Sequence, residues 1–162
     1  MIVRRELPAD PTRDVHLAAF ETPLETRLLD ALRADPGWLP RFSLVAERAG
    51  RVVGHVVCTR GRVAATPALG LGPLAVLPEE QGRGVGSALM HAVLGAADAA
   101  DEPFVALLGE PAYYGRFGFR AASERGIGAP DAAWGAYFQV RTLTAFRPVS
   151  GVFAYAAPFS SL

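Results

Sequence analysis

The chain contains neither lysine nor asparagine, so all sixteen of its basic side chains are arginines. The absence of lysine excludes a nucleotide loop of the Walker type, because that loop needs a lysine followed by serine or threonine. Alanine, glycine and proline are abundant, a composition typical of a GC-rich bacterial genome. An individual arginine is therefore a weaker indication of bidentate anion recognition than in a chain that uses both basic residues.

The chain also lacks net charge, since sixteen acidic residues balance the sixteen arginines. Its overall charge would therefore attract neither nucleic acid nor an anionic membrane. No apolar run reaches the roughly 18 residues that span a bilayer, and the first ten residues, MIVRRELPAD, lack the apolar segment of a signal peptide. We expect a soluble, cytoplasmic protein with no nucleic-acid or membrane partner.

Only one cysteine is present, Cys58, so no disulfide can form within the chain. It lies in the apolar run VVGHVVCT, where a small buried side chain is expected rather than a nucleophile. No metal is expected. The length and the apolar content of 51% fit a single domain spanning residues 1–162.

Apolar periodicity and turn residues divide the chain into mixed helices and strands. Helices are predicted over residues 13–20, 23–34 and 85–97. Strands are predicted over residues 1–6, 42–47, 51–59, 71–77, 104–108 and 136–143. Thr66-Pro67 is expected to break the chain before the fourth strand, and the tail 146–159 is apolar but irregular. This mixture favours an α/β fold in which helices pack on a mixed sheet.

A glycine-rich loop, Gln81-Gly82-Arg83-Gly84-Val85-Gly86, joins the predicted strand 71–77 to the third predicted helix. The first N–H groups of a helix lack partners and carry partial positive charge, and glycine lets a phosphate approach the backbone closely. We therefore predict an anion site at residues 81–87. A Rossmann loop is disfavoured, because its glycines follow G-x-G-x-x-G and these follow G-x-G-x-G. A turn that binds no ligand is the structural alternative.

Two patterns occur one predicted helix and one predicted strand apart: Val76-x-Pro78-x-x-Gln81-x-x-Gly84-x-Gly86 and Tyr113-Tyr114-x-Arg116-x-Gly118-Phe119. The first resembles the acetyl-coenzyme A loop of the GNAT superfamily of N-acetyltransferases, and the second resembles that family's second signature. The resemblance covers residues 42–119. It implies a central, mostly antiparallel sheet with two splayed central strands and helices on both faces.

The resemblance implies that acetyl-coenzyme A is the co-substrate and indicates where it binds. The backbone of Leu74, Ala75 and Val76 would hydrogen-bond the pantetheine arm in the wedge between the strands 71–77 and 104–108. The Arg83 side chain would approach the phosphates. The pyrophosphate would be held by the backbone N–H groups of Gln81, Gly82, Arg83, Gly84, Val85, Gly86 and Ser87.

The resemblance also implies direct attack of an amine on the thioester, with both substrates in one site. Tyr114 occupies the family's position for the acid that serves the leaving thiolate. The alternative is a core aromatic whose hydroxyl is tied to the backbone. Tyr113 is interpreted as a packing residue.

The strand LGLGPLAVL has no carboxylate that could serve as the base, so the base is sought elsewhere in the chain. Glu110 is the candidate, and its alternative role is that of an acid favoured at a helix N-terminus. His55 acting through water is a second candidate, and a hydrogen-bonded strand histidine is its alternative. Glu79 and Glu80 are expected to face solvent.

We therefore expect an N-acetyltransferase that acetylates a primary amine on a small molecule or a protein. The alternative is a non-catalytic acyl-coenzyme A binding or regulatory module, which would keep residues 81–87 and need no acid at Tyr114. The apolar tail 149–159 would either cover the sheet or form a homodimer contact.

Overall fold

The computed structural model describes residues 1–161. Within them a nine-stranded, mostly antiparallel sheet runs in the order β1-β2-β3-β4-β5-β8-β6, and β9 pairs with β3 and β7. The strands are β1 (Ile2–Arg5), β2 (Ser43–Arg48), β3 (Arg51–Val63), β4 (Thr66–Val76), β5 (Phe104–Leu108), β6 (Arg120–Ala121), β7 (Ile127–Gly128), β8 (Phe138–Thr142) and β9 (Gly151–Ala154).

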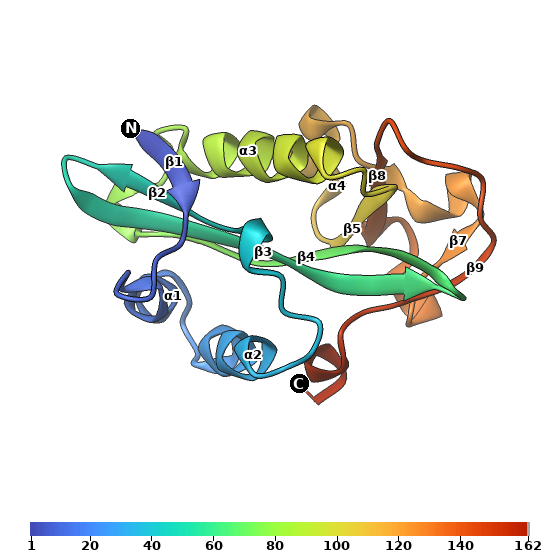
Figure 1. The fold of residues 1–162 in the computed structure, drawn as a ribbon, viewed down its shortest axis with the longest axis horizontal. Helices are drawn as coiled ribbons and strands as arrows, with labels where there is room; N and C mark the ends of the chain where they lie inside the picture. Colours follow the sequence, from blue (N-terminus) through green and yellow to red (C-terminus); the bar gives the residue numbers. More distant parts are fainter. Residues whose placement is uncertain (162) are drawn as a thin grey trace.

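Helices cover both faces of this sheet (Figure 1). α1 (Thr12–Ala19) and α2 (Leu24–Arg33) lie on one face. α3 (Val85–Ala99) and the short α4 (Pro111–Tyr114) lie on the other. The predicted mixed sheet with helices on both faces is confirmed.

α3 packs on the sheet through apolar residues at helical spacing, among them Val85, Leu89 and Val93, which are almost fully buried. Gly54 of β3 permits this approach, because a Cβ there would lie 2.9 Å from side-chain carbons of Val85 and Leu89. Burying each such side chain contributes roughly 1.5–3 kcal/mol. The core therefore fixes the start of α3, where the glycine-rich loop ends.

β4 and β5 are parallel neighbours that pair at only two positions, Leu69 with Val105 and Gly70 with Ala106. Both strands continue beyond these pairs without further pairing to each other, so they diverge. The predicted splay of the two central strands is thus confirmed. The β3–β4 register also shifts beside Pro73, between the positions of Leu71 and Leu74, as expected for a residue that cannot donate to a ladder.

Two parts of the strand prediction were wrong or incomplete. β4 begins at Thr66, because the chain already reverses at Ala64, whose φ is +50°, and Pro67 is paired with Arg62. Proline is tolerated near the start of a strand. The tail contains β9, whose Phe153 is 1% exposed. The tail therefore covers the sheet within its own chain, and the homodimer stays a prediction.

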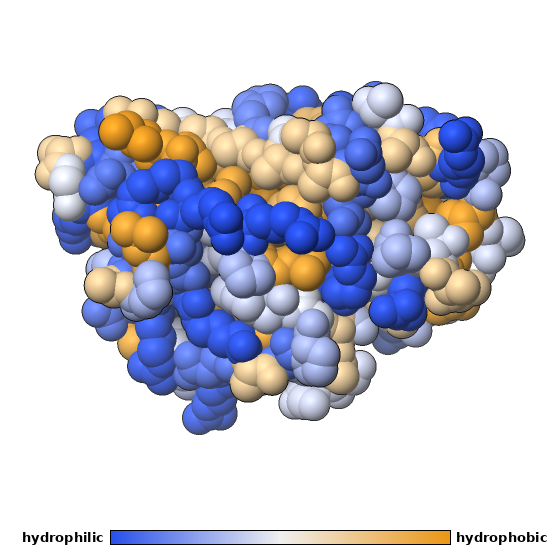
Figure 2. Space-filling view, viewed as in Figure 1, coloured by the Kyte–Doolittle hydropathy of each residue, from blue (hydrophilic) through white to orange (hydrophobic). Residues whose placement is uncertain are grey.

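The surface over α1 and α2 is mainly hydrophilic in Figure 2. The large exposed apolar side chains come from separate elements, including β1, α1, α2 and β5. No helix within residues 1–161 is long and apolar enough to cross a bilayer. Cys58 is fully buried, and burial raises the pKa of its thiol, as expected for a packing residue.

Candidate active site

The glycine-rich loop lines an open cavity of about 470 Å³ at the start of α3. Gly82 and Gly84 have φ values of +73° and +84°, and a Cβ on either would meet no heavy atom within 4 Å. No side chain caps α3, so its first N–H groups keep their donor capacity. The cavity is lined by Val76, Glu80, Gln81, Gly82, Gly84, Val85, Gly86, Ser87, Tyr113 and Arg116.

Two side chains of the loop are engaged within the chain. Gln81 Nε2 donates to the carbonyl oxygen of Val76 at 3.1 Å, which ties the loop to the end of β4. Arg83 Nη1 lies 3.2 Å from Glu80 Oε2, and Arg48 Nε lies 3.2 Å from the same oxygen. These two guanidinium groups account for the burial of Glu80, which had been expected to face solvent. The charge of Arg83 is thus directed at Glu80 rather than into the cavity.

Arg116 supplies a positive charge to this cavity instead. Its Cζ lies 4.7 Å from the centre of the Tyr113 ring, a cation–π contact. A Cβ at Gly86 would lie 3.1 Å from Tyr113 Oη, so glycine leaves the room that this tyrosine occupies. The two sequence patterns therefore lie against each other. Sequence reasoning included Arg116 in a motif without giving it a role.

The end of β4 presents backbone groups to the gap between β4 and β5. The Leu77 N–H donates to the Val53 carbonyl oxygen of β3 at 2.9 Å. Because the backbone groups of a strand point alternately to its two sides, those of Val76 and Leu74 point away from β3. Those of Ala75 point toward β3 and are used within the sheet, which argues against the predicted role of Ala75.

A second cavity, of about 570 Å³, lies in the gap between β4 and β5. Its lining comes from both faces of the sheet, because α2 and α4 both contribute (Figure 1). The lining residues are Phe20, Glu25, Leu28, Leu71, Gly72, Pro73, Leu74, Leu107, Leu108, Tyr114, Trp134, Tyr155 and Phe159.

Tyr114 lies in this second cavity with its ring against Gly109, where a Cβ would collide with the ring. Burial and the neighbouring Tyr113 raise the pKa of the Tyr114 hydroxyl, so it keeps its proton at neutral pH. Burial and Tyr113 are the causes of this shift, and no hydrogen bond is among them. The hydroxyl is therefore free to donate to a molecule in the cavity.

Residues 40–121 match the family model described as an acetyltransferase (GNAT) domain. The chain belongs to the GNAT acetyltransferase family. Two relatives from Escherichia coli support this assignment to the family. The uncharacterized N-acetyltransferase YjhQ is 35% identical over 127 residues, which cover 75% of this chain and 70% of YjhQ. The uncharacterized N-acetyltransferase YhbS is 31% identical over 166 residues, which cover 99% of each chain.

Solved structures of GNAT proteins share the fold. The crystal structure of E. coli YhbS in complex with CoA has a TM-score of 0.88 and 30% identity, covering 98% of this chain and 91% of that one. A GNAT family acetyltransferase from Brucella melitensis in complex with acetyl-CoA has a TM-score of 0.79 and 34% identity, covering 98% and 97%. The predicted family, fold and class of enzyme, an acyltransferase, are confirmed.

Glu110, the predicted base of this GNAT enzyme, lies outside both cavities. Its side chain is exposed and caps α4, where Oε1 accepts a hydrogen bond from the Ala112 N–H at 3.4 Å. This geometry supports the alternative interpretation of Glu110 as an acid at a helix N-terminus.

His55 is a buried, hydrogen-bonded strand histidine, which was the alternative to its role as a base. Its Nε2 lies 2.8 Å from Ser43 Oγ, and its Nδ1 lies 2.8 Å from His16 Nε2. Burial lowers the pKa of His55 to about 3 and that of His16 to about 4. Both rings are therefore neutral at physiological pH and hold α1 against β3.

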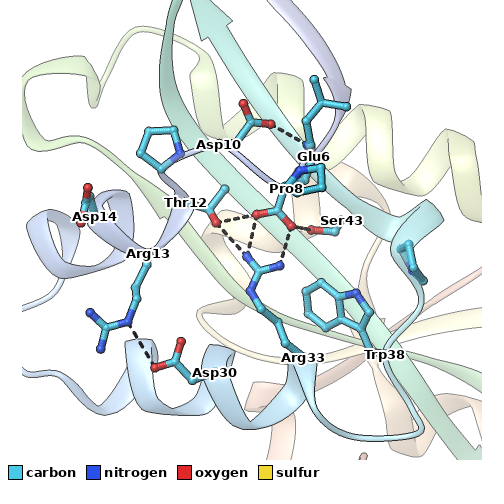
Figure 3. A pocket seen from close by; sticks show the side chains of 13 residues that line it. Glu6, Pro8, Asp10, Thr12, Arg13, Asp14, Asp30, Arg33, Trp38 and Ser43 are labelled. Atoms are coloured by element: carbon cyan, nitrogen blue, oxygen red, sulfur yellow. Dashed lines mark hydrogen bonds and ion pairs between the residues drawn. The ribbon is translucent and has the colours of Figure 1, made fainter.

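A third cavity, of about 460 Å³, is lined by residues of α1, α2 and the segment after β1 (Figure 3). Figure 3 shows Arg33 pointing toward Glu6 and Arg13 pointing toward Asp30. Arg33 Nη2 lies 2.6 Å from Glu6 Oε2, and Arg13 Nε lies 3.2 Å from Asp30 Oδ2. Thr12 donates a further hydrogen bond to Glu6. These pairs join the N-terminal strand to both helices, and we interpret the cluster as structural.

Proposed function

We propose that this GNAT enzyme transfers the acetyl group of acetyl-coenzyme A to a primary amine. The observation that carries the proposal is the adjacency of the two cavities. Val76 and Tyr113 line the first cavity, whereas Leu74 and Tyr114 line the second. A molecule with phosphates at the loop can therefore extend along the open edge of β4 to Tyr114. Coenzyme A has this form, with a pyrophosphate, an amide-bearing arm and a terminal sulfur.

The pyrophosphate is held by backbone N–H groups between Gly82 and Ser87, at the positive end of α3. Arg116 adds a cation beside them. The backbone groups of Leu74 and Val76 hydrogen-bond the amides of the pantetheine arm. The Val76 N–H is also suited to the thioester carbonyl, where negative charge develops during attack. Solved structures of YhbS and of the Brucella relative contain CoA and acetyl-CoA respectively, which supports acetyl-coenzyme A as the co-substrate.

The reaction is an acyl transfer within a ternary complex. The neutral amine nitrogen attacks the thioester carbonyl carbon, the C–S bond breaks, and the nitrogen loses a proton to water, so that the products are an amide, the thiolate of coenzyme A and a proton. The Tyr114 hydroxyl donates a hydrogen bond to that thiolate. An ordinary tyrosine pKa of about 10 exceeds that of a thiol at about 8.5, so Tyr114 stabilises the leaving group mainly by hydrogen bonding.

Thiol release from acetyl-coenzyme A in the presence of a panel of primary amines tests this function. Replacing Tyr114 by phenylalanine should lower kcat by about 10- to 100-fold, while the Kd for coenzyme A changes by less than about twofold. Tyr137→Phe is the control, because Tyr137 is 52% exposed and lines neither cavity. An unchanged kcat in Tyr114→Phe would remove this residue from the mechanism. Binding of coenzyme A without amine-dependent release by the wild type would favour a non-catalytic module.

A further inference from the structure

Glu25 supplies the only charged side chain among the described residues that line the cavity between β4 and β5. Its Oε2 is buried and has no hydrogen-bond partner within residues 1–161. A buried carboxylate oxygen without a partner is costly to the fold, and a bound donor removes that cost. Two carboxylates of the cavity in Figure 3, Glu6 and Asp30, differ from Glu25 because each is paired with an arginine.

Glu25 and Tyr114 line the cavity from opposite faces of the sheet. Glu25 lies in the first turn of α2, and Tyr114 lies on α4 at the other face of the sheet. The gap between β4 and β5 joins them in a single cavity. Under the proposed function the co-substrate reaches this cavity along the edge of β4 and beside Tyr114. An acceptor that enters beneath the sheet would then present its amine between Glu25 and the thioester.

We infer that Glu25 binds the ammonium group of the acceptor and takes up the proton that the nitrogen loses before attack. This inference rests on the proposed function. One N–H bond of the ammonium group breaks as a carboxyl O–H bond forms, and the freed nitrogen lone pair attacks the carbonyl carbon. As the C–S bond breaks, the thiolate leaves toward Tyr114, and the nitrogen loses its second proton to water to give the neutral amide. The carboxyl group then returns its proton to water through the open mouth of the cavity.

The other residues of the cavity favour an amine that is attached to an apolar group. A volume of about 570 Å³ lies within the range of small-molecule sites. A second ammonium group buried there would find no second acidic side chain in the lining, which disfavours polyamines. The apolar walls are formed by Leu28, Leu71, Leu107, Trp134, Tyr155 and Phe159.

The Glu25→Gln variant tests the role of the carboxylate, because it keeps the shape of the side chain and removes its charge. We expect kcat/KM for 2-phenylethylamine to fall by about 10- to 100-fold, as for the loss of a hydrogen bond to a charged group, with an unchanged Kd for coenzyme A. Glu21→Gln is the matched control, because Glu21 is exposed and lies outside the cavity lining. Hydroxylamine is already neutral at pH 7.5, so Glu25→Gln should use it at the wild-type rate. That second readout separates lost recognition of the amine from a damaged fold.

The acceptor selectivity of the wild type tests the preference for an apolar amine independently of any variant. We expect 2-phenylethylamine to exceed spermidine in kcat/KM by at least about tenfold. A peptide with N-terminal phenylalanine carries the same chemistry, and its rate relative to the free amine assigns the source of the acceptor.

Three outcomes would overturn the inference and leave acetyl transfer standing. They are equal use of spermidine, an unaltered kcat/KM in Glu25→Gln, and turnover with hydroxylamine but none with either phenyl-bearing amine. An absence of turnover with every nucleophile would instead overturn the proposed function, and the inference with it.

Discussion

Replacing Gly84 by glutamate places a negative side chain where the loop would hold a pyrophosphate. The φ of Gly84 is +84°, and its missing Cβ faces open space. Gly50, in the turn between β2 and β3, offers a matched control, because its φ is +78° and its missing Cβ also meets no heavy atom within 4 Å. The two substitutions therefore impose the same backbone strain at different places.

The strain of a left-handed conformation costs a non-glycine residue about 1–2 kcal/mol. In a chain of this length each kcal/mol lowers Tm by about 2–4 °C, so both variants should melt about 2–8 °C below the wild type. Coenzyme A at about 100 times its Kd adds about 2.7 kcal/mol to the folded state, which corresponds to a rise of about 5–11 °C. We expect that rise for the wild type and Gly50→Glu, and none for Gly84→Glu.

Thermal denaturation with and without coenzyme A measures both effects in one experiment. A Gly84→Glu protein that still gains several degrees from coenzyme A would show that the phosphates do not lie at this loop. A Gly50→Glu protein that loses the gain would show that strain alone abolishes binding. Either result would refute the assignment of the loop, whereas loss confined to Gly84→Glu supports it.

Two further predictions follow from the charges around the site and in the core. Arg116→Ala should raise the Kd for coenzyme A by about 5- to 10-fold. Arg83→Ala should raise it by less than about twofold, because Arg83 pairs with Glu80. Calorimetry that gave the reverse order would show that Arg83 is the phosphate ligand. Stability should fall as the pH is lowered from 7 to 5, because burial lowers the pKa of His16 to about 4 and that of His55 to about 3. The histidines of the unfolded chain bind protons below their ordinary pKa of about 6.5. The neutral pair therefore contributes its full free energy of folding above that pH, and the contribution falls by about 2 kcal/mol per histidine at pH 5, as the pH approaches the pKa values of the folded state. A Tm that stays constant between pH 7 and pH 5 would contradict a neutral pair.

The glycine-rich loop and the helix that follows it could be predicted because their signals are local. The glycine spacing before Val85 and the apolar period of α3 lie in one continuous stretch. Thr66-Pro67 misled the prediction, because a proline ends a strand only where its missing N–H is needed for pairing. The prediction that Glu80 faces solvent was wrong because its partner Arg48 lies on a strand distant in the sequence.

The cavity that we propose for the acceptor could not be predicted, because segments distant in the sequence form it. In the sequence, Glu25 is an ordinary acid in the first turn of a helix, where the helix dipole favours one. One signal was present: Glu25 shares a face of α2 with Leu28 and Leu32, which are buried. An acid on the apolar face of an amphipathic helix needs a partner or a function. Only the fold shows that this face meets the gap between β4 and β5.

The divergence of β4 and β5 connects these two halves of the site. Had the strands stayed paired beyond Gly70, the backbone of Leu74 and Val76 would be consumed by the ladder and α2 would be sealed from α4. The splay leaves those donors open and creates a passage through the sheet. In the function that we propose, this one irregularity provides both the backbone edge that binds the co-substrate and the opening through which the acceptor enters. Because the passage is lined by α2 and by the C-terminal third, substitutions there should change acceptor choice without changing coenzyme A affinity, whereas substitutions at Gly82–Ser87 should do the opposite.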